Sequence, residues 1–121
     1  MHRLHSIEVS ETDNGHHAVV IKLQGSMDDE VERILRLEFD KTLVRERQGG
    51  VILDMKNVTE IGGIVQTRIA SFARHLAHDG IEMVIVTPRN RVPALGLVSL
   101  ASSFSMVPRL EMAKEMLGIT E

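Results

Sequence analysis

Hydrophobic and polar residues along this chain follow two different periods. Strict alternation predicts a β-strand, whereas apolar residues three or four positions apart predict an amphipathic helix. Two strand-like stretches come first, at residues 4–9 and 18–23, and the pair Asn14-Gly15 between them is a hairpin turn signal. The second stretch is almost entirely apolar, which predicts a strand in the interior of a sheet.

Helix-like and strand-like stretches alternate through the rest of the chain. Ser26 or Asp28 can cap the first helix, and Pro93 suits the first turn of a later one. The resulting order, β-β-α-β-α-β-α-β-α, predicts a hairpin followed by strands that pair mostly in parallel. Helices are expected from about 28 to 47, from 62 to 79, after residue 90 and over 110–117, with strands over 51–55, 81–86 and 104–107.

Length and composition narrow the class of protein. A chain of 121 residues is expected to form one domain, over residues 1–121. The net charge of −3 argues against a nucleic-acid-binding surface, which is usually basic. The chain has no cysteine, which excludes disulfides and thiolate chemistry. No apolar run approaches the roughly 18 residues of a spanning helix, and the first residues lack a signal-peptide pattern, so we expect a cytoplasmic protein that does not itself span a membrane.

Candidate catalytic and metal-ligating residues lack partners in the sequence. His75 and His78 are three positions apart on a predicted helix, but no third ligand is placed near them, so solvated helix residues are the expectation and no metal. Asp54 is predicted to end a strand as a turn or capping carboxylate. Gly62-Gly63 lacks the Lys-Ser/Thr of a phosphate-binding loop. We therefore expect no catalytic residues, no cofactor and no enzymatic activity.

Several short motifs, in order along the chain, resemble those of one family. They are Leu23-Gln24-Gly25-Ser26-Met27-Asp28, the stretches 51–59 and 80–86, Arg91-Val92-Pro93-Ala94-Leu95, and the stretches 104–107 and 110–113. Together they resemble the STAS family, the domain of bacterial anti-sigma-factor antagonists. The resemblance covers nearly the whole chain and implies an α/β fold: a STAS-like single domain with a mixed β-sheet and helices packed mainly on one face.

The resemblance breaks at the start of the second helix. The family usually carries Asp-Ser-Ser-Gly there, or Asp followed by Ser or Thr, and a partner kinase phosphorylates the first Ser or Thr. In this chain Gly62 takes the Asp position and Gly63 takes the phosphoacceptor position. Glycine has no hydroxyl, so position 63 is not phosphorylatable. Thr59 and Thr67 do not fall at the acceptor position.

Two interpretations of Gly62-Gly63 remain open. The glycines either form a plain loop whose family role is lost, with Ile64 folded into the core, or belong to a docking surface that is always available, with Ile64 exposed. The family position implies partner binding by the loop and helix start, extended by two neighbouring turns. The expected partner-binding residues are Ile61, Gly62, Gly63, Ile64, Val65 and Arg68, with Met27, Asp28, Thr87, Pro88 and Arg89.

Three functions are compatible with these observations. The first is a non-catalytic protein–protein interaction module in signalling and regulation of transcription, an anti-sigma-factor-antagonist-like regulator that binds an anti-sigma factor or other kinase-like regulator without a phosphorylation switch. The second is an accessory STAS subunit of a membrane lipid-transport ATPase complex. The third is a nucleotide or small-anion sensor that uses the Gly62-Gly63 helix start. A homodimer would also suit the exposed surface, and no nucleic-acid partner is expected.

Overall fold

The structure is a computed structural model of the chain, and it describes residues 5–11, 18–44, 49–88 and 105–118. The turn Asn14-Gly15, the residue Arg89 and the helix expected after residue 90 lie outside this part. The described elements are β1 (His5–Glu11), β2 (Val19–Met27), α1 (Glu32–Val44), β3 (Val51–Ile61), α2 (Gly63–His78), β4 (Met83–Val86), β5 (Ser105–Val107) and α3 (Leu110–Met116).

The five strands form one sheet in the order β1-β2-β3-β4-β5. β1 pairs with β2 antiparallel, and the pairs β2–β3, β3–β4 and β4–β5 are parallel. The mixed sheet expected from the order of elements is therefore confirmed. β2 lies between two strands, as its nearly continuous apolar sequence predicts.

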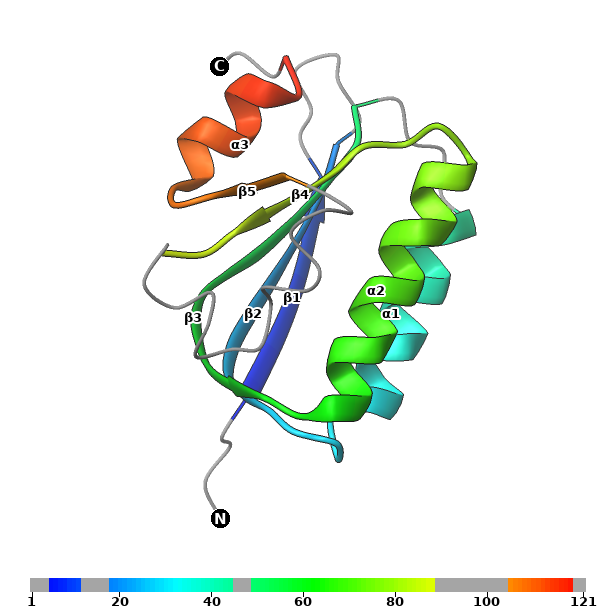
Figure 1. Cartoon of the computed structure of the whole chain (residues 1–121), viewed down its shortest axis with the longest axis vertical. Coiled ribbons are helices and arrows are strands. Elements are labelled where there is room, and N and C mark those ends of the chain that lie inside the picture. The colour runs from blue at the N-terminus through cyan, green and yellow to red at the C-terminus, as the bar shows by residue number, and fades with distance from the viewer. Residues whose placement is uncertain (1–4, 12–17, 45–48, 89–104, 119–121) are drawn as a thin grey trace.

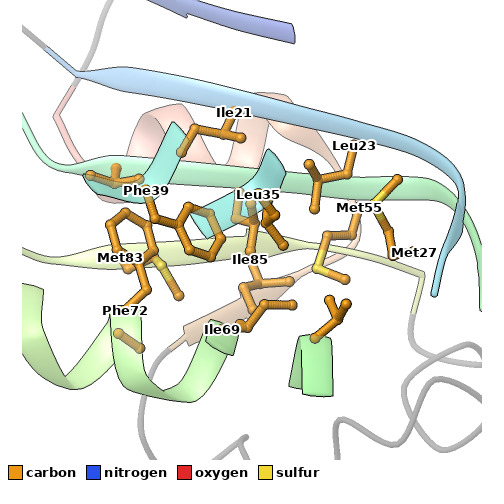
Figure 2. Close-up of a cluster of buried hydrophobic side chains, with 14 of the residues drawn as sticks. Ile21, Leu23, Met27, Leu35, Phe39, Met55, Ile69, Phe72, Met83 and Ile85 are labelled. Atoms are coloured by element: carbon orange, nitrogen blue, oxygen red, sulfur yellow. The ribbon is translucent and has the colours of Figure 1, made fainter. Parts of the chain in front are cut away.

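Two helices cover one face of the sheet, and the third lies on the other (Figure 1). Alternate residues of β2, β3 and β4 point toward α1 and α2 and bury a common core, of which Figure 2 shows Ile21, Leu35 and Ile85. The rings of Phe39 on α1 and Phe72 on α2 stack at 4.0 Å between centroids, with 4° between their planes. This contact joins the two helices over the sheet.

The opposite face carries a smaller core beneath α3. Ile52 of β3 and Val84 and Val86 of β4 pack there with Val107 and Ala113. β3 and β4 are therefore buried on both sides, which explains why their sequences are continuous apolar runs. Within the described residues, no helix is long and apolar enough to cross a membrane.

Several boundaries differ from those expected; β2, for example, continues beyond Leu23 to Met27. Two further differences have a local cause. β3 continues through Lys56 and Asn57 to Ile61. These two polar residues interrupt the apolar run in the sequence, but backbone pairing with β2 keeps this segment in the strand. α1 begins at Glu32, because Asp28 Oδ1 accepts a hydrogen bond from the Glu30 N–H at 3.1 Å and forms a turn before the helix.

Val84→Asp is expected to abolish folding. Val84 is fully buried in β4, and an unpaired carboxylate there costs more than about 4 kcal/mol, a large share of the roughly 5–15 kcal/mol that stabilises a domain. The measurement is thermal unfolding by circular dichroism. Ile34→Asp, on the exposed side of α1, is the matched control and should melt cooperatively. A cooperative wild-type-like transition for the Val84 variant would contradict the two-sided burial of β4.

Candidate functional site

The parallel strands β2 and β3 end beside each other, and each leads into a helix at that edge (Figure 1). Met27 is paired with Ile61, and the Gly62 N–H donates to the Met27 carbonyl at 2.9 Å. The Ser26 hydroxyl donates to Glu60 Oε1 at 2.6 Å. These contacts bring together the turn before α1 and the start of α2. We call the result the helix-start surface; it comprises Asp28, Asp29, Glu30, Glu60, Ile61, Gly62, Gly63 and Ile64.

Ile64 is the apolar residue that this surface presents to solvent. Its side chain is 53% exposed, whereas the next residue, Val65, is fully buried in the core. Gly63 beside it is also exposed. The sequence left open whether Ile64 is buried in the core or exposed, and in the structure it is exposed. The reason is that Val65 occupies the inward position in the first turn of α2.

The start of α2 is capped by a residue from a different element. Gly62 is the N-cap in an extended conformation (φ −73°, ψ 160°) and has no side chain to bind the free N–H groups, and the first helical turn contains no acidic residue. Asp29, in the turn before α1, accepts a hydrogen bond at Oδ1 from the Ile64 N–H at 3.2 Å. A carboxylate at a helix N-terminus is stabilising because it satisfies an N–H and faces the positive end of the helix dipole.

The sequence analysis missed this contact. In the sequence Asp29 is one of several adjacent acidic residues before the first helix. Its partner amide lies 35 positions away. Only the absence of a capping side chain at position 62 signals in the sequence that another group is needed there.

The helix-start surface is acidic. Asp28, Asp29 and Glu30 lie in one turn, and Glu60 lies on the adjoining end of β3. Arg68, which could offset this charge, is engaged elsewhere: its Nε and Nη2 both lie 2.9 Å from Glu32 Oε1. This ion pair connects α1 with α2 and leaves the arginine half-buried.

Several residues expected to contact a partner have a different place in the structure. The side chains of Met27 and Val65 are fully buried because they point into the core between sheet and helices, and Thr87 is 1% exposed at the end of β4. These three side chains are therefore not part of the exposed helix-start surface. Arg68 belongs to the ion pair with Glu32, and Pro88 is half-buried beyond β4.

The structure also corrects the predicted position of Asp54 at the end of a strand. It lies inside β3, is 2% exposed, and does not end the strand. Its Oδ2 lies 3.0 Å from Lys56 Nζ, and its Oδ1 accepts from the Lys56 N–H at 3.2 Å. The pairing with Lys56 compensates the buried charge.

His75 and His78 are both exposed near the end of α2. Within the described ranges, no three His, Asp or Glu side chains come together as a metal site would require.

The family model of the STAS domain matches residues 7–113. The chain belongs to the STAS domain family. Among curated proteins, none matches this sequence.

Solved STAS structures share the fold. An anti-sigma factor antagonist from Mycobacterium paratuberculosis superposes with a TM-score of 0.71 at 18% identity, covering 93% of this chain and 95% of that one. The Bacillus cell fate determinant SpoIIAA in its phosphorylated form gives 0.71 at 13% identity, covering 93% and 99%. A variant of RsbS from Moorella thermoacetica gives 0.72 at 13% identity, covering 93% and 94%. At these identities the likeness establishes the fold.

Gly63→Ala is expected to raise the stability of the domain. A Cβ at position 63 would meet no atom within 4 Å, and alanine loses less backbone entropy than glycine on entering a helix. The expected gain is up to about 1 kcal/mol, measured as a higher melting temperature. A lower melting temperature would show that position 63 needs glycine for its conformation.

Thr87→Val is also expected to stabilise the fold. Among the described residues, the buried Thr87 Oγ1 has no hydrogen-bond partner. Replacing the hydroxyl by a methyl group of similar volume removes a desolvation cost of roughly 1–3 kcal/mol. The measurement is urea unfolding, with Thr87→Ser as the control that keeps the hydroxyl and should not gain stability. A loss of stability in the valine variant would mean that the hydroxyl is bonded.

Proposed function

We propose that this STAS domain is a cytoplasmic, non-catalytic interaction module, an anti-sigma-factor-antagonist-like regulator that binds a protein partner through the helix-start surface. The observation that carries the proposal is the exposure of Ile64 beside Gly63 at the start of α2. The names of the solved relatives from Mycobacterium and Bacillus support this class of function.

The exposed isoleucine gives the surface an apolar anchor. Burying a side chain of this size against a partner contributes roughly 1.5–3 kcal/mol. The neighbouring carboxylates of Asp28, Glu30 and Glu60 would surround such a contact and favour a partner with basic residues at its rim. The expected partner is therefore a protein with an apolar pocket for Ile64 and basic residues around that pocket.

The surface would be available at all times. In a STAS domain with serine at the position of Gly63, phosphorylation adds about −1.5 to −2 charges at the helix start and changes what the surface can bind. Gly63 cannot carry that group. The chain would accordingly act as a partner whose binding is controlled by its abundance, or by a modification of the other protein.

The anion-sensor hypothesis is disfavoured by the same geometry. A phosphate at a helix start binds to free N–H groups, and a nearby cation would strengthen that binding. Here the Ile64 N–H is bound to the Asp29 carboxylate, and the Arg68 guanidinium is paired with Glu32. A phosphate would face the acidic turn.

The proposal is tested by partner capture with wild type, Gly63→Ala and Gly63→Asp from an extract of the native cell. Gly63→Asp places a negative charge at the acceptor position and should reduce capture of a kinase-like anti-sigma factor at least tenfold, whereas Gly63→Ala adds a side chain without charge and should bind like wild type. Equal capture by all three would remove the helix start from the interface. Capture of a transport ATPase instead would assign the chain to the accessory-subunit class.

A second pair of variants tests the apolar anchor. Ile64 and Leu37 are similarly exposed, at 53% and 52%, but Leu37 lies on α1 outside the helix-start surface. Ile64→Ser is expected to weaken binding at least tenfold, while Leu37→Ser leaves it unchanged. The dissociation constants are measured by calorimetry with the captured protein. Equal losses for both variants, or a loss for Leu37→Ser alone, would place the interface elsewhere.

A further inference from the structure

We propose that Asp29 is the positioning residue of the helix-start surface: its carboxylate occupies the place of the missing N-cap side chain at Gly62 and fixes the turn before α1 to the start of α2. The structural part of this inference stands on contacts within the chain. Its consequence for binding rests on the proposed function.

The hydrogen-bond geometry is that of a helix cap supplied from another element. With Gly62 as the N-cap, Ile64 is the second helical residue, and its N–H is one that an N-cap side chain normally binds. Asp29 Oδ1 accepts from that N–H at 3.2 Å. The carboxylate therefore performs the capping role although it belongs to a different segment.

The space at position 62 gives a second argument. A Cβ on Gly62 would clash with Asp29 Oδ1 and would lie 3.2 Å from the Asp29 backbone nitrogen. The φ of Gly62 is −73°, which any residue adopts, so the backbone conformation does not demand glycine. Glycine fits here because the carboxylate of Asp29 fills the volume that a side chain would take. Position 63, by contrast, is open to a Cβ.

Other contacts also connect the turn before α1 with the start of α2. The Gly62 N–H donates to the Met27 carbonyl, and Arg68 pairs with Glu32. These two contacts lie on either side of the Asp29–Ile64 bond along both segments. Asp29 thus fixes the part of the surface that bears the exposed Ile64, and it holds the acidic turn beside the start of α2.

The decisive experiment is a double-mutant cycle on thermal stability, with the variants Asp29→Ala, Gly62→Asp and the double variant. Asp29→Ala removes the cap and should raise the unfolding equilibrium constant about fivefold, a typical loss for a capping side chain. Gly62→Asp alone should also lower the melting temperature, because two carboxylates then compete for one place. In the double variant the new side chain can cap its own helix, so the melting temperature should return to within a few degrees of wild type.

Three further measurements separate capping from a general effect on folding. Asp29→Asn keeps an oxygen acceptor and should retain most of the stability, and Asp40→Ala, an exposed carboxylate on α1, should change nothing. Hydrogen exchange of the Ile64 amide should accelerate at least tenfold in Asp29→Ala and slow again in the double variant. Additive losses in the cycle, or an Ile64 amide unaffected by Asp29→Ala, would overturn the inference.

Partner capture with the same variants separates this inference from the proposed function. Binding should fall in Asp29→Ala and recover in the double variant. If the stability cycle shows the coupling but wild type captures no protein partner, the cap at Asp29 stands and the proposed function fails. If a partner is captured equally by wild type and Asp29→Ala, the positioning role in binding is contradicted.

Discussion

The parallel pairing of β2 with β3 is the constraint on which the site depends. Because the two strands run in the same direction, both end at one edge of the sheet, and the helices that follow them start there together. Each helix must then return along the same face. That return packs Phe39 against Phe72 and buries the main core (Figure 2). Core, helix contact and helix-start surface are thus consequences of one strand pairing.

The two adjacent glycines at this edge serve different physical purposes. Gly62 leaves room for a carboxylate that arrives from another segment, whereas Gly63 leaves an open, exposed position on the first turn of α2. A side chain at the second position would project from the surface, while one at the first would displace Asp29. The pair therefore combines a space that Asp29 fills with an exposed position that carries no hydroxyl.

Much of the fold could be predicted from local patterns. The structure confirms the burial pattern predicted for five elements. The signals were the alternation in β1, the apolar runs of β2 and β4, and the four-residue spacing in α1 and α2. β3 was predicted too short because Lys56 and Asn57 are exposed in a strand held by backbone pairing with β2. Some of the residues expected to bind a partner are buried for a related reason. Chain neighbours of an exposed residue, such as Met27 and Val65, point to the opposite side and enter the core.

The sequence by itself determined the order of the described elements, the family, and the absence of a hydroxyl at position 63, because each of these follows from residue types and short-range spacing. Tertiary structure decided which side chains of the site are exposed and which group caps α2. Asp29 and the Ile64 amide are 35 positions apart and meet only because β2 and β3 end together. Arg68 and Glu32, 36 positions apart, are joined in the same way. Contacts at such separations depend on strand order and register, which no local period encodes.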